Sequence, residues 1–286
     1  MSTFKEIKKR INAIKSTRKT TSAMKMVASS KLMKAESVMK ALSSYAGEIR
    51  RILNSLMTSD YSGPLSLERP VEHVAIITFS SDSSLCGAYN SNISHVLQKT
   101  VNKYKKSLDA SHIHVYTIGK KVFEFSKKTK ITVTQNFENL AGKTNYPTIA
   151  NLAMSLIEKF ENKQLDSVEL IYYHFKSAGS QELVTKQLLP IKLPVQEQQS
   201  IDYILEPSRE SLLKSLIPKN IQIQLYTALL HANASEHAAR MIAMQTATDN
   251  ADDLVSELTI EYNKSRQQAI TNELLDIVGG SVKNQQ

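Results

Sequence analysis

The first 56 residues of this chain carry a heptad pattern that runs without a change of register. Alternating steps of four and three residues from Ile7 reach fifteen positions, and twelve of them are apolar. The positions are Ile7, Ile11, Ile14, Arg18, Thr21, Lys25, Ala28, Leu32, Ala35, Met39, Leu42, Ala46, Ile49, Leu53 and Leu56. A seam of this length predicts one long helix that packs along another helix. Its three consecutive polar positions (Arg18, Thr21 and Lys25) either specify the register or meet another protein, and the sequence favours neither.

A second long helix is predicted near the C-terminus, because residues 219–278 contain neither Gly nor Pro. Pro218 comes just before this stretch and Gly279-Gly280 just after it, which are typical signals for the start and the end of a helix. Roughly 55 to 60 residues at 1.5 Å per residue make a rod of about 80–90 Å, longer than a compact domain needs. We therefore expect the two helices to wind around each other in antiparallel fashion and to project, with their ends supported by other chains.

Charge is distributed unevenly between these two helices. Residues 1–53 hold thirteen Lys and Arg against three Glu, whereas residues 225–286 hold four Lys and Arg against eight Asp and Glu. Flanking charges of opposite sign would help the two helices to pair. The basic segment could equally attract nucleic acid or an acidic protein surface, but it has almost no aromatic side chains on which bases could stack.

Short apolar runs alternate with helical patterns between the two long helices. Strands are predicted at 73–79, 113–118, 131–134, 168–175 and 181–189, and helices at 89–106, 120–128 and 147–162. This alternation is typical of a small α/β domain with a largely parallel sheet. The predicted fold is therefore an antiparallel coiled coil of the N- and C-terminal helices with a central, small Rossmann-like α/β domain. Its segments are 1–60, 70–206 and 208–286.

Several classes of protein are excluded by simple counts. The single cysteine excludes an internal disulfide framework and a cysteine-based zinc cluster. No apolar run approaches the ~20 residues that a membrane span needs, so we expect no direct insertion into a membrane. The start of the chain lacks the apolar core of a secretory signal.

Two fragments suggest nucleotide or metal binding, and each is incomplete. Gly142-Lys143-Thr144 resembles the end of a phosphate-binding loop, but Phe137 stands where that loop needs glycine. His112 and His114 lie two residues apart on a predicted strand and share a face, but no third ligand is near them in sequence. We expect neither a cofactor nor a metal, and a satisfied surface pair of histidines is favoured.

Two further residues suggest catalysis. Cys86 follows a Ser-rich turn at the end of a strand, where α/β enzymes place nucleophiles, but no general base is identifiable and a packing role is favoured. His237 has Glu236 beside it, yet adjacent residues on a helix do not face each other. The sequence therefore offers no catalytic constellation.

Three segments resemble the gamma subunit of the F-type ATP synthases. They are IKKRINAIKSTRKTTSAMKMVASSKL (7–32), SDSSLCGAYNSNI (81–93) and ASEHAARMIAMQTATDNADDL (234–254), the last continuing into YNKSRQQAITNELLDIVGG (262–280). They occur in the order of the family and cover essentially the whole chain. The resemblance implies a non-catalytic subunit of the proton-translocating complex. Its coiled coil threads a ring of alpha and beta subunits, and its base joins the epsilon subunit and the c subunits of the membrane rotor ring.

The resemblance also implies contacts with the beta subunit at particular residues. Met24 and Lys25 match the lower shaft segment that faces an acidic region of beta. Arg266, Gln267 and Thr271 match contacts with beta loops higher on the shaft. The apolar stretch 274–278 resembles the tip that sits in a sleeve at the top of the ring.

Two departures from the family accompany this match. Thr20 stands where the family usually has an aliphatic residue, and Ser83-Ser84 replaces the usual basic-Gly pair. A start at Met1 without a transit peptide suggests a bacterial protein, peripheral to the cytoplasmic face of the plasma membrane. Two alternatives stay open. One is a basic coiled-coil protein that binds nucleic acid or organises a complex, and the other is a small α/β nucleotide-binding enzyme with helical arms, which the incomplete phosphate loop weakens.

Overall fold

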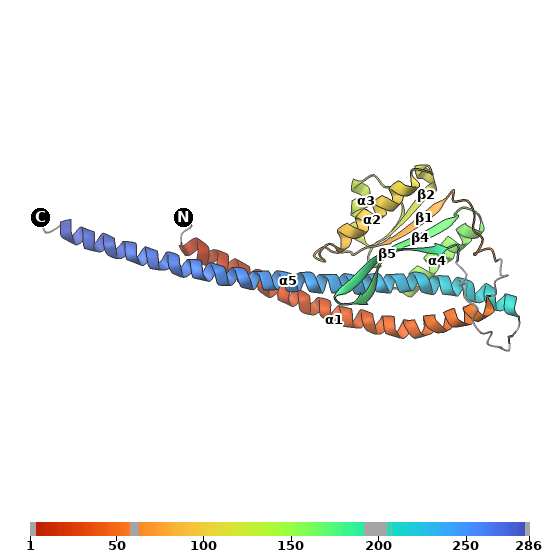
Figure 1. Ribbon diagram of the computed structural model, residues 1–286, viewed down its shortest axis with the longest axis horizontal. Helices are drawn as coiled ribbons and strands as arrows, with labels where there is room; N and C mark the ends of the chain where they lie inside the picture. Colours follow the sequence, from red (N-terminus) through yellow and green to blue (C-terminus); the bar gives the residue numbers. More distant parts are fainter. Residues whose placement is uncertain (1–3, 58–62, 192–204, 207, 284–286) are drawn as a thin grey trace. The chain divides into compact units, whose positions relative to one another are not determined.

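The computed structural model describes residues 4–57, 63–191, 205–206 and 208–283, and the side chains of the last helix as far as Leu275. Its contacts form two compact units, one made of Met1–Ala28 with Met241–Gln286 and the other of Ser29–Arg240. Each unit contains part of both terminal helices, α1 (Phe4–Leu56) and α5 (Arg209–Lys283). These helices are the red-to-orange and the cyan-to-blue ribbons of Figure 1. The division into 1–60, 70–206 and 208–286 stays a prediction.

Helix α1 confirms the heptad seam. Fourteen of its fifteen predicted positions are buried or half-buried, and Arg18 alone is exposed. In the second unit, Leu53 and Leu56 are each only 3% exposed, because they join the core under the sheet. Helix α1 is polar on average, and it is stable in the folded chain because this one apolar stripe is buried.

Helix α5 differs from the prediction at both ends. It begins at Arg209, contains Pro218 and continues through Gly279-Gly280 to Lys283, so the start and stop signals predict its bounds wrongly. Leu213 and Ile217 are 4% and 3% exposed. Burying each contributes about 1.5–3 kcal/mol, which offsets the roughly 3 kcal/mol that an internal proline costs. Despite their length, none of the helices among the described residues is apolar enough to cross a membrane.

The second unit contains a five-stranded sheet with the order β3-β2-β1-β4-β5. The strands are β1 (Val74–Phe79), β2 (Ile113–Ile118), β3 (Val133–Phe137), β4 (Ser167–Ser177) and β5 (Ser180–Leu189). The first four are parallel, and β5 runs antiparallel to β4. This confirms the largely parallel sheet, and the order matches the first five strands of a Rossmann fold.

Helices cover both faces of this sheet. They are α2 (Tyr89–Tyr104), α3 (Lys120–Lys128) and α4 (Tyr146–Glu161), and a 3-10 turn, η1 (Ala110–His112), precedes β2. Strand β1 shows how the faces divide, because successive side chains of a strand point to opposite sides. Val74 and Ile76 pack with side chains of α2 and α3. Ala75, Ile77 and Phe79 pack with α4, α5 and the end of α1.

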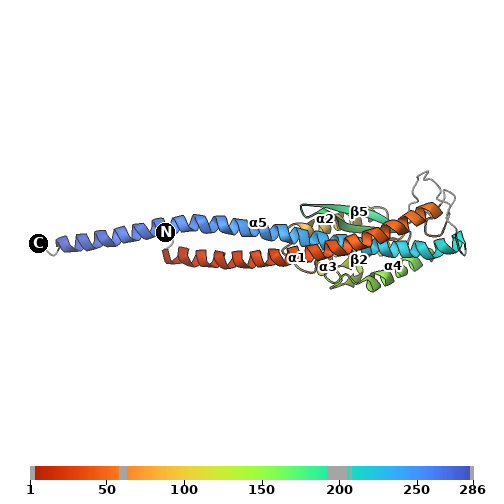
Figure 2. The same ribbon diagram turned by 90° about the horizontal axis from the view of Figure 1, so that it is seen from below.

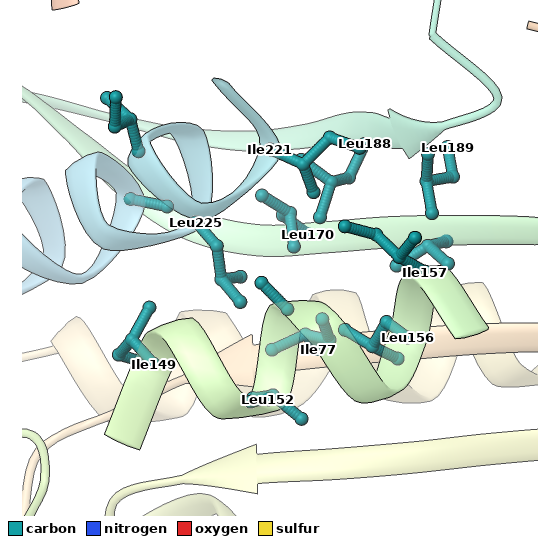
Figure 3. Close-up of a cluster of buried hydrophobic side chains, with 14 of the residues drawn as sticks. Ile77, Ile149, Leu152, Leu156, Ile157, Leu170, Leu188, Leu189, Ile221 and Leu225 are labelled. Carbon is teal, nitrogen blue, oxygen red and sulfur yellow. The ribbon is translucent and has the colours of Figure 1, made fainter. Parts of the chain in front are cut away.

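The larger of the two cores lies on the face that the terminal helices share. Figure 3 shows side chains of α4 and α5 converging on β1, β4 and β5, and the labelled ones are all buried. These are Ile77, Ile149, Leu152, Leu156, Ile157, Leu170, Leu188, Leu189, Ile221 and Leu225. The sheet is therefore anchored on α5, and any partner surface of this unit must lie outside this core.

Candidate partner-binding surfaces on the terminal helices

The first unit is a pair of helix segments that run in opposite directions. Ile7 and Ile11 of α1 form a buried cluster with Leu258 of α5. Ile14, Val255 and Tyr262 pack at its edges. Both views of this unit show α1 and α5 side by side (Figures 1 and 2). The antiparallel pairing of the terminal helices that the sequence predicts is therefore confirmed.

Two of the three polar seam residues are paired within the chain. The Nη1 atom of Arg18 lies 3.0 Å from the Oδ1 atom of Asp252 and forms an ion pair with it. The hydroxyl groups of Thr21 and Thr248 share a hydrogen bond of 2.8 Å. The Arg18–Asp252 pair is about half exposed, so it contributes less than about 1 kcal/mol, but both bonds fix how the helices align. Lys25 has no hydrogen bond or ion pair with any described residue. The structure thus favours the register role for Arg18 and Thr21, and leaves Lys25 available to another protein.

Met24 and Lys25, the first predicted contacts, are half-buried on α1. Met26 and Val27 follow them and expose 67% and 56% of their surface. Two adjacent large apolar side chains exposed to water, one of them a methionine, are suited to a surface that another protein covers.

Arg266 and Gln267, the next predicted contacts, are exposed side chains of α5. The hydroxyl of Thr271 donates to the Gln267 carbonyl oxygen of its own helix at 3.0 Å, which leaves its lone pairs free to accept. The Arg266 guanidinium forms no ion pair with a described residue, and Ile270 beside it is 45% exposed. The helix therefore has a cation, an amide, a hydroxyl and an apolar side chain exposed on its surface, a set of groups that a partner could bind.

These residues lie where α5 has no helix beside it. Because Ile7, near the start of α1, already packs against Leu258, the residues after Tyr262 pass beyond the described part of α1. Figure 1 shows the blue end of α5 continuing past the first turn of α1. Leu274 and Leu275 of the predicted tip are 57% and 64% exposed, and the side chains of 276–278 lie outside the described residues. This unpaired segment, residues 263–275, is the clearest candidate for a partner-binding surface in the first unit.

In the second unit, Cys86 is a packing residue. Its side chain is 1% exposed and lies 3.8 Å from Ser81 Oγ, and Asn90 Nδ2 donates to its sulfur at 3.1 Å. Burial raises the pKa of the thiol, which is the opposite of what a nucleophile needs. The predicted packing role of Cys86 is confirmed by its burial.

The His112–His114 pair is joined in space by a third histidine. The His73 ring centroid lies 4.3 Å from that of His112 and 6.0 Å from that of His114. Within the described ranges, however, no group of three or more His, Cys, Asp or Glu could hold a metal ion. His112 lies in η1 rather than on strand β2, so the shared strand face predicted for the pair is wrong.

Glu236 pairs with Arg240, one helical turn away, rather than with His237. The two side chains are 7% and 12% exposed, and burial raises the pKa of Glu236 while Arg240 opposes that rise. Arg240 Nη2 also donates to Ser83 Oγ at 2.8 Å and to the carbonyl oxygens of Ser83 and Ser84. The Ser83-Ser84 turn, a departure from the family, is thereby held to α5. This ion pair is not among those predicted from the sequence, although the i, i+4 spacing of Glu236 and Arg240 indicates it.

A family model described as ATP synthase matches residues 3–282 of the chain. The ATP synthase gamma chain of Bacteroides fragilis is 49% identical over 290 residues, which cover 99% of this chain and all of the relative. That of Geobacter metallireducens is 38% identical over 285 residues, which cover 98% of each chain. This chain belongs to the ATP synthase gamma chain family. The gamma chain resemblance inferred from three motifs is confirmed.

Solved structures share the gamma chain fold. One is a chain of the central stalk and c-ring of the Tetrahymena thermophila mitochondrial ATP synthase, with a TM-score of 0.59, 24% identity and coverage of 79% of this chain and 98% of that one. Another comes from the Euglena gracilis mitochondrial ATP synthase in rotational state 3, with a TM-score of 0.66 and 18% identity. The match covers 98% of this chain and 93% of that one. The two terminal helices and the α/β region are therefore a gamma chain architecture.

Proposed function

We propose that this chain is the central rotor shaft of an F-type ATP synthase. Driven by the ion flow through a membrane ring of c subunits, it would rotate within a ring of alpha and beta subunits and make their nucleotide sites change conformation in turn. The proposal extends to an epsilon subunit at the base and to a peripheral location at the cytoplasmic face of a bacterial plasma membrane. The chain itself would contribute no catalytic residue and no cofactor.

The observation that carries the proposal is the unpaired segment 263–275 of α5. An isolated helix of this length is marginal in water, and Leu274 and Leu275 expose more than half of their surface. A helix with exposed apolar side chains beyond its own partner is suited to insertion into a surrounding sleeve. Family membership makes the ring of alpha and beta subunits the natural sleeve.

Coupling requires that the shaft bind one conformation of a beta subunit more tightly than another. Moving a two-state equilibrium from 1:99 to 99:1 takes about 5.5 kcal/mol of differential binding, more than one exposed contact supplies. We therefore assign the difference to several contacts at two heights, Met24 and Lys25 on α1 and Arg266, Gln267 and Thr271 on α5. Lys25 and Arg266 have no ion pair within the described residues, so each can form charge-assisted hydrogen bonds with acidic residues.

The test compares two double variants in the complex. The chain is co-expressed with the alpha and beta subunits of the same organism, the complex is isolated, and Mg-ATP hydrolysis is measured. The variant Arg266→Ala with Gln267→Ala removes the proposed contacts. Its matched control, Lys264→Ala with Gln268→Ala, removes a cation and an amide from another exposed face of the same helix, since a helix turns about 100° per residue.

We expect one copy of this chain in each complex and a several-fold loss of hydrolysis for the Arg266 and Gln267 variant, with the control within about twofold of the parent. Equal effects of the two variants would contradict the assignment of Arg266 and Gln267 as contacts, but not the proposed role of the chain as the shaft. If no complex forms, and the chain is instead retained on DNA in a salt-dependent way, the nucleic-acid-binding alternative replaces the proposal.

A further inference from the structure

The second unit contains a cavity of about 520 Å³ that the shaft role does not use. Its walls come from α1, from the turn after β1, from the loop before α4 and from α5. Three exposed lysines surround it, Lys31 and Lys34 one turn apart on α1 and Lys143 on the loop. Cavities of 300–1,000 Å³ are the usual size of small-molecule sites.

Cations around this cavity outnumber the carboxylates that could neutralise them. The lining holds four cations, the three lysines and Arg240, and two carboxylates, Asp82 and Glu236. Glu236 is already paired with Arg240, which leaves one carboxylate, Asp82, against the three lysines, so the lining keeps an excess of positive charge.

None of the three lysines forms an ion pair or a side-chain hydrogen bond within the described ranges. Three ammonium groups around one hollow repel each other and attract an anion.

A buried polar group without a partner lies in the wall of the same cavity. His237 is 7% exposed, and its Nδ1 has no hydrogen-bond partner within the described residues. Burial, helped by Arg240 and Lys31, lowers the pKa of its ring to about 4. The ring is therefore neutral at pH 7 and can donate one hydrogen bond without adding charge. Buried polar atoms without partners are rare in native proteins and often mark a site that a ligand or water completes.

We propose that this cavity binds a compact phosphate anion, of the pyrophosphate or sugar-phosphate class, between the lysines of α1 and Lys143. Gly142 and Thr144 flank Lys143 in the lining, so part of the wall is small and polar. The lining holds no Phe, Tyr or Trp, and the two side chains in it that could stack on a base, His237 and Arg240, are largely buried, so a nucleobase would find little exposed surface to stack on. The chemistry therefore selects the phosphate groups and not a nucleotide base.

The test is a calorimetric titration of the full chain with sodium pyrophosphate at fixed ionic strength. A triple variant, Lys31→Gln, Lys34→Gln and Lys143→Gln, removes the charges, and all three side chains are exposed, so folding is retained. The control triple variant, Lys105→Gln, Lys106→Gln and Lys128→Gln, removes three exposed lysines outside the cavity. Ribose 5-phosphate and ATP are titrated in parallel, to separate the sugar-phosphate source and a contribution of the base.

We expect one pyrophosphate per chain, with at least a tenfold weaker affinity in the cavity variant and an unchanged affinity in the control, because charge-assisted bonds to phosphate are lost only in the first. Tighter binding of ribose 5-phosphate would identify the sugar-phosphate source. Equal weakening in both triple variants would show attraction to net charge alone and overturn the site. Absence of binding by the parent chain, together with weaker assembly of the cavity variant with alpha and beta, would assign the lysines to a protein partner instead.

Discussion

Replacing Arg240 with leucine should destabilise the second unit in a way that depends on pH. Arg240 is the partner of the buried carboxylate of Glu236, and it also holds the Ser83-Ser84 turn through its other nitrogen. Leucine keeps most of the volume but leaves Glu236, at 7% side-chain exposure, without a counter-charge. Breaking a buried ion pair by removing one partner costs about 3–5 kcal/mol.

The sign of the pH dependence follows from Glu236. Burial raises its pKa above the ordinary 4.5, and Arg240 is the main group that opposes this rise. In the variant, burial acts without that opposition, so the folded carboxyl holds its proton to higher pH than the unfolded one. A group whose acid pKa is raised by folding destabilises the folded state as pH rises above its unfolded pKa. The loss should therefore be close to the full 3–5 kcal/mol at pH 8 and smaller at pH 5.

Urea unfolding of the full chain, followed by circular dichroism and tyrosine fluorescence at pH 5 and pH 8, measures both values. Lys176→Leu is the matched control, because its ion pair with Glu182 is also short, at 2.7 Å, but both side chains are 55% exposed. Such an exposed pair contributes at most about 1 kcal/mol. A loss for Arg240→Leu that is no larger than that of the control, or that is the same at both pH values, would refute the buried-pair reasoning.

Three further substitutions test the packing of the second unit. Gly119→Ala should lower the free energy of unfolding by at least about 2 kcal/mol in urea titrations, because φ is 98° there and the new Cβ would lie 2.2 Å from the Ser80 carbonyl oxygen. Gly47→Ala should instead raise it by roughly 0.5–1 kcal/mol, since Gly47 lies within α1 with nothing within 4 Å of the new methyl group; a loss of stability there would contradict the open surface. Tyr89→Phe should lower the free energy of unfolding by about 1 kcal/mol, and the melting temperature with it, because the buried hydroxyl donates to the Ala232 carbonyl oxygen at 2.9 Å. An unchanged melting temperature would mean that this bond is not formed in solution.

Periodicity predicted the architecture well because burial here follows regular stripes. Alternating steps of four and three residues were enough to predict the buried seam of α1. Strand β2 and helix α3 begin and end at the predicted residues. The bounds of α5 could not be predicted in this way. Pro218 and Gly279-Gly280 are local signals for the start and the end of a helix, and the helix continues through both. Leu213 and Ile217 are buried by the sheet, which is a tertiary contact that no local signal records.

The contacts that position functional groups were predictable only in part. The i, i+4 spacing predicts the pairing of Glu236 with Arg240. The bond from Arg240 to Ser83 joins residues more than 150 positions apart, and no local pattern predicts it. The cavity beside them likewise joins α1, two loops and α5. Composition indicated a basic α1 segment. The absence of carboxylate partners for Lys31 and Lys34 among the described residues is a property of the folded chain.

The unequal extent of the two terminal helices separates a stretch of α5 that pairs with α1 from a stretch that is left exposed. Where α1 and α5 run together, apolar seam residues and the Arg18 and Thr21 bonds satisfy the pair internally. Beyond Tyr262 the helical pattern of apolar residues continues, through Ile270 to Leu274, without a described helix to bury them. Because an exposed apolar stripe is costly in water, its persistence points to a surface that covers it in the assembled state. The pairing of α5 with α1 therefore ends where α1 begins, and of the proposed contacts only Met24 and Lys25 lie within the paired stretch.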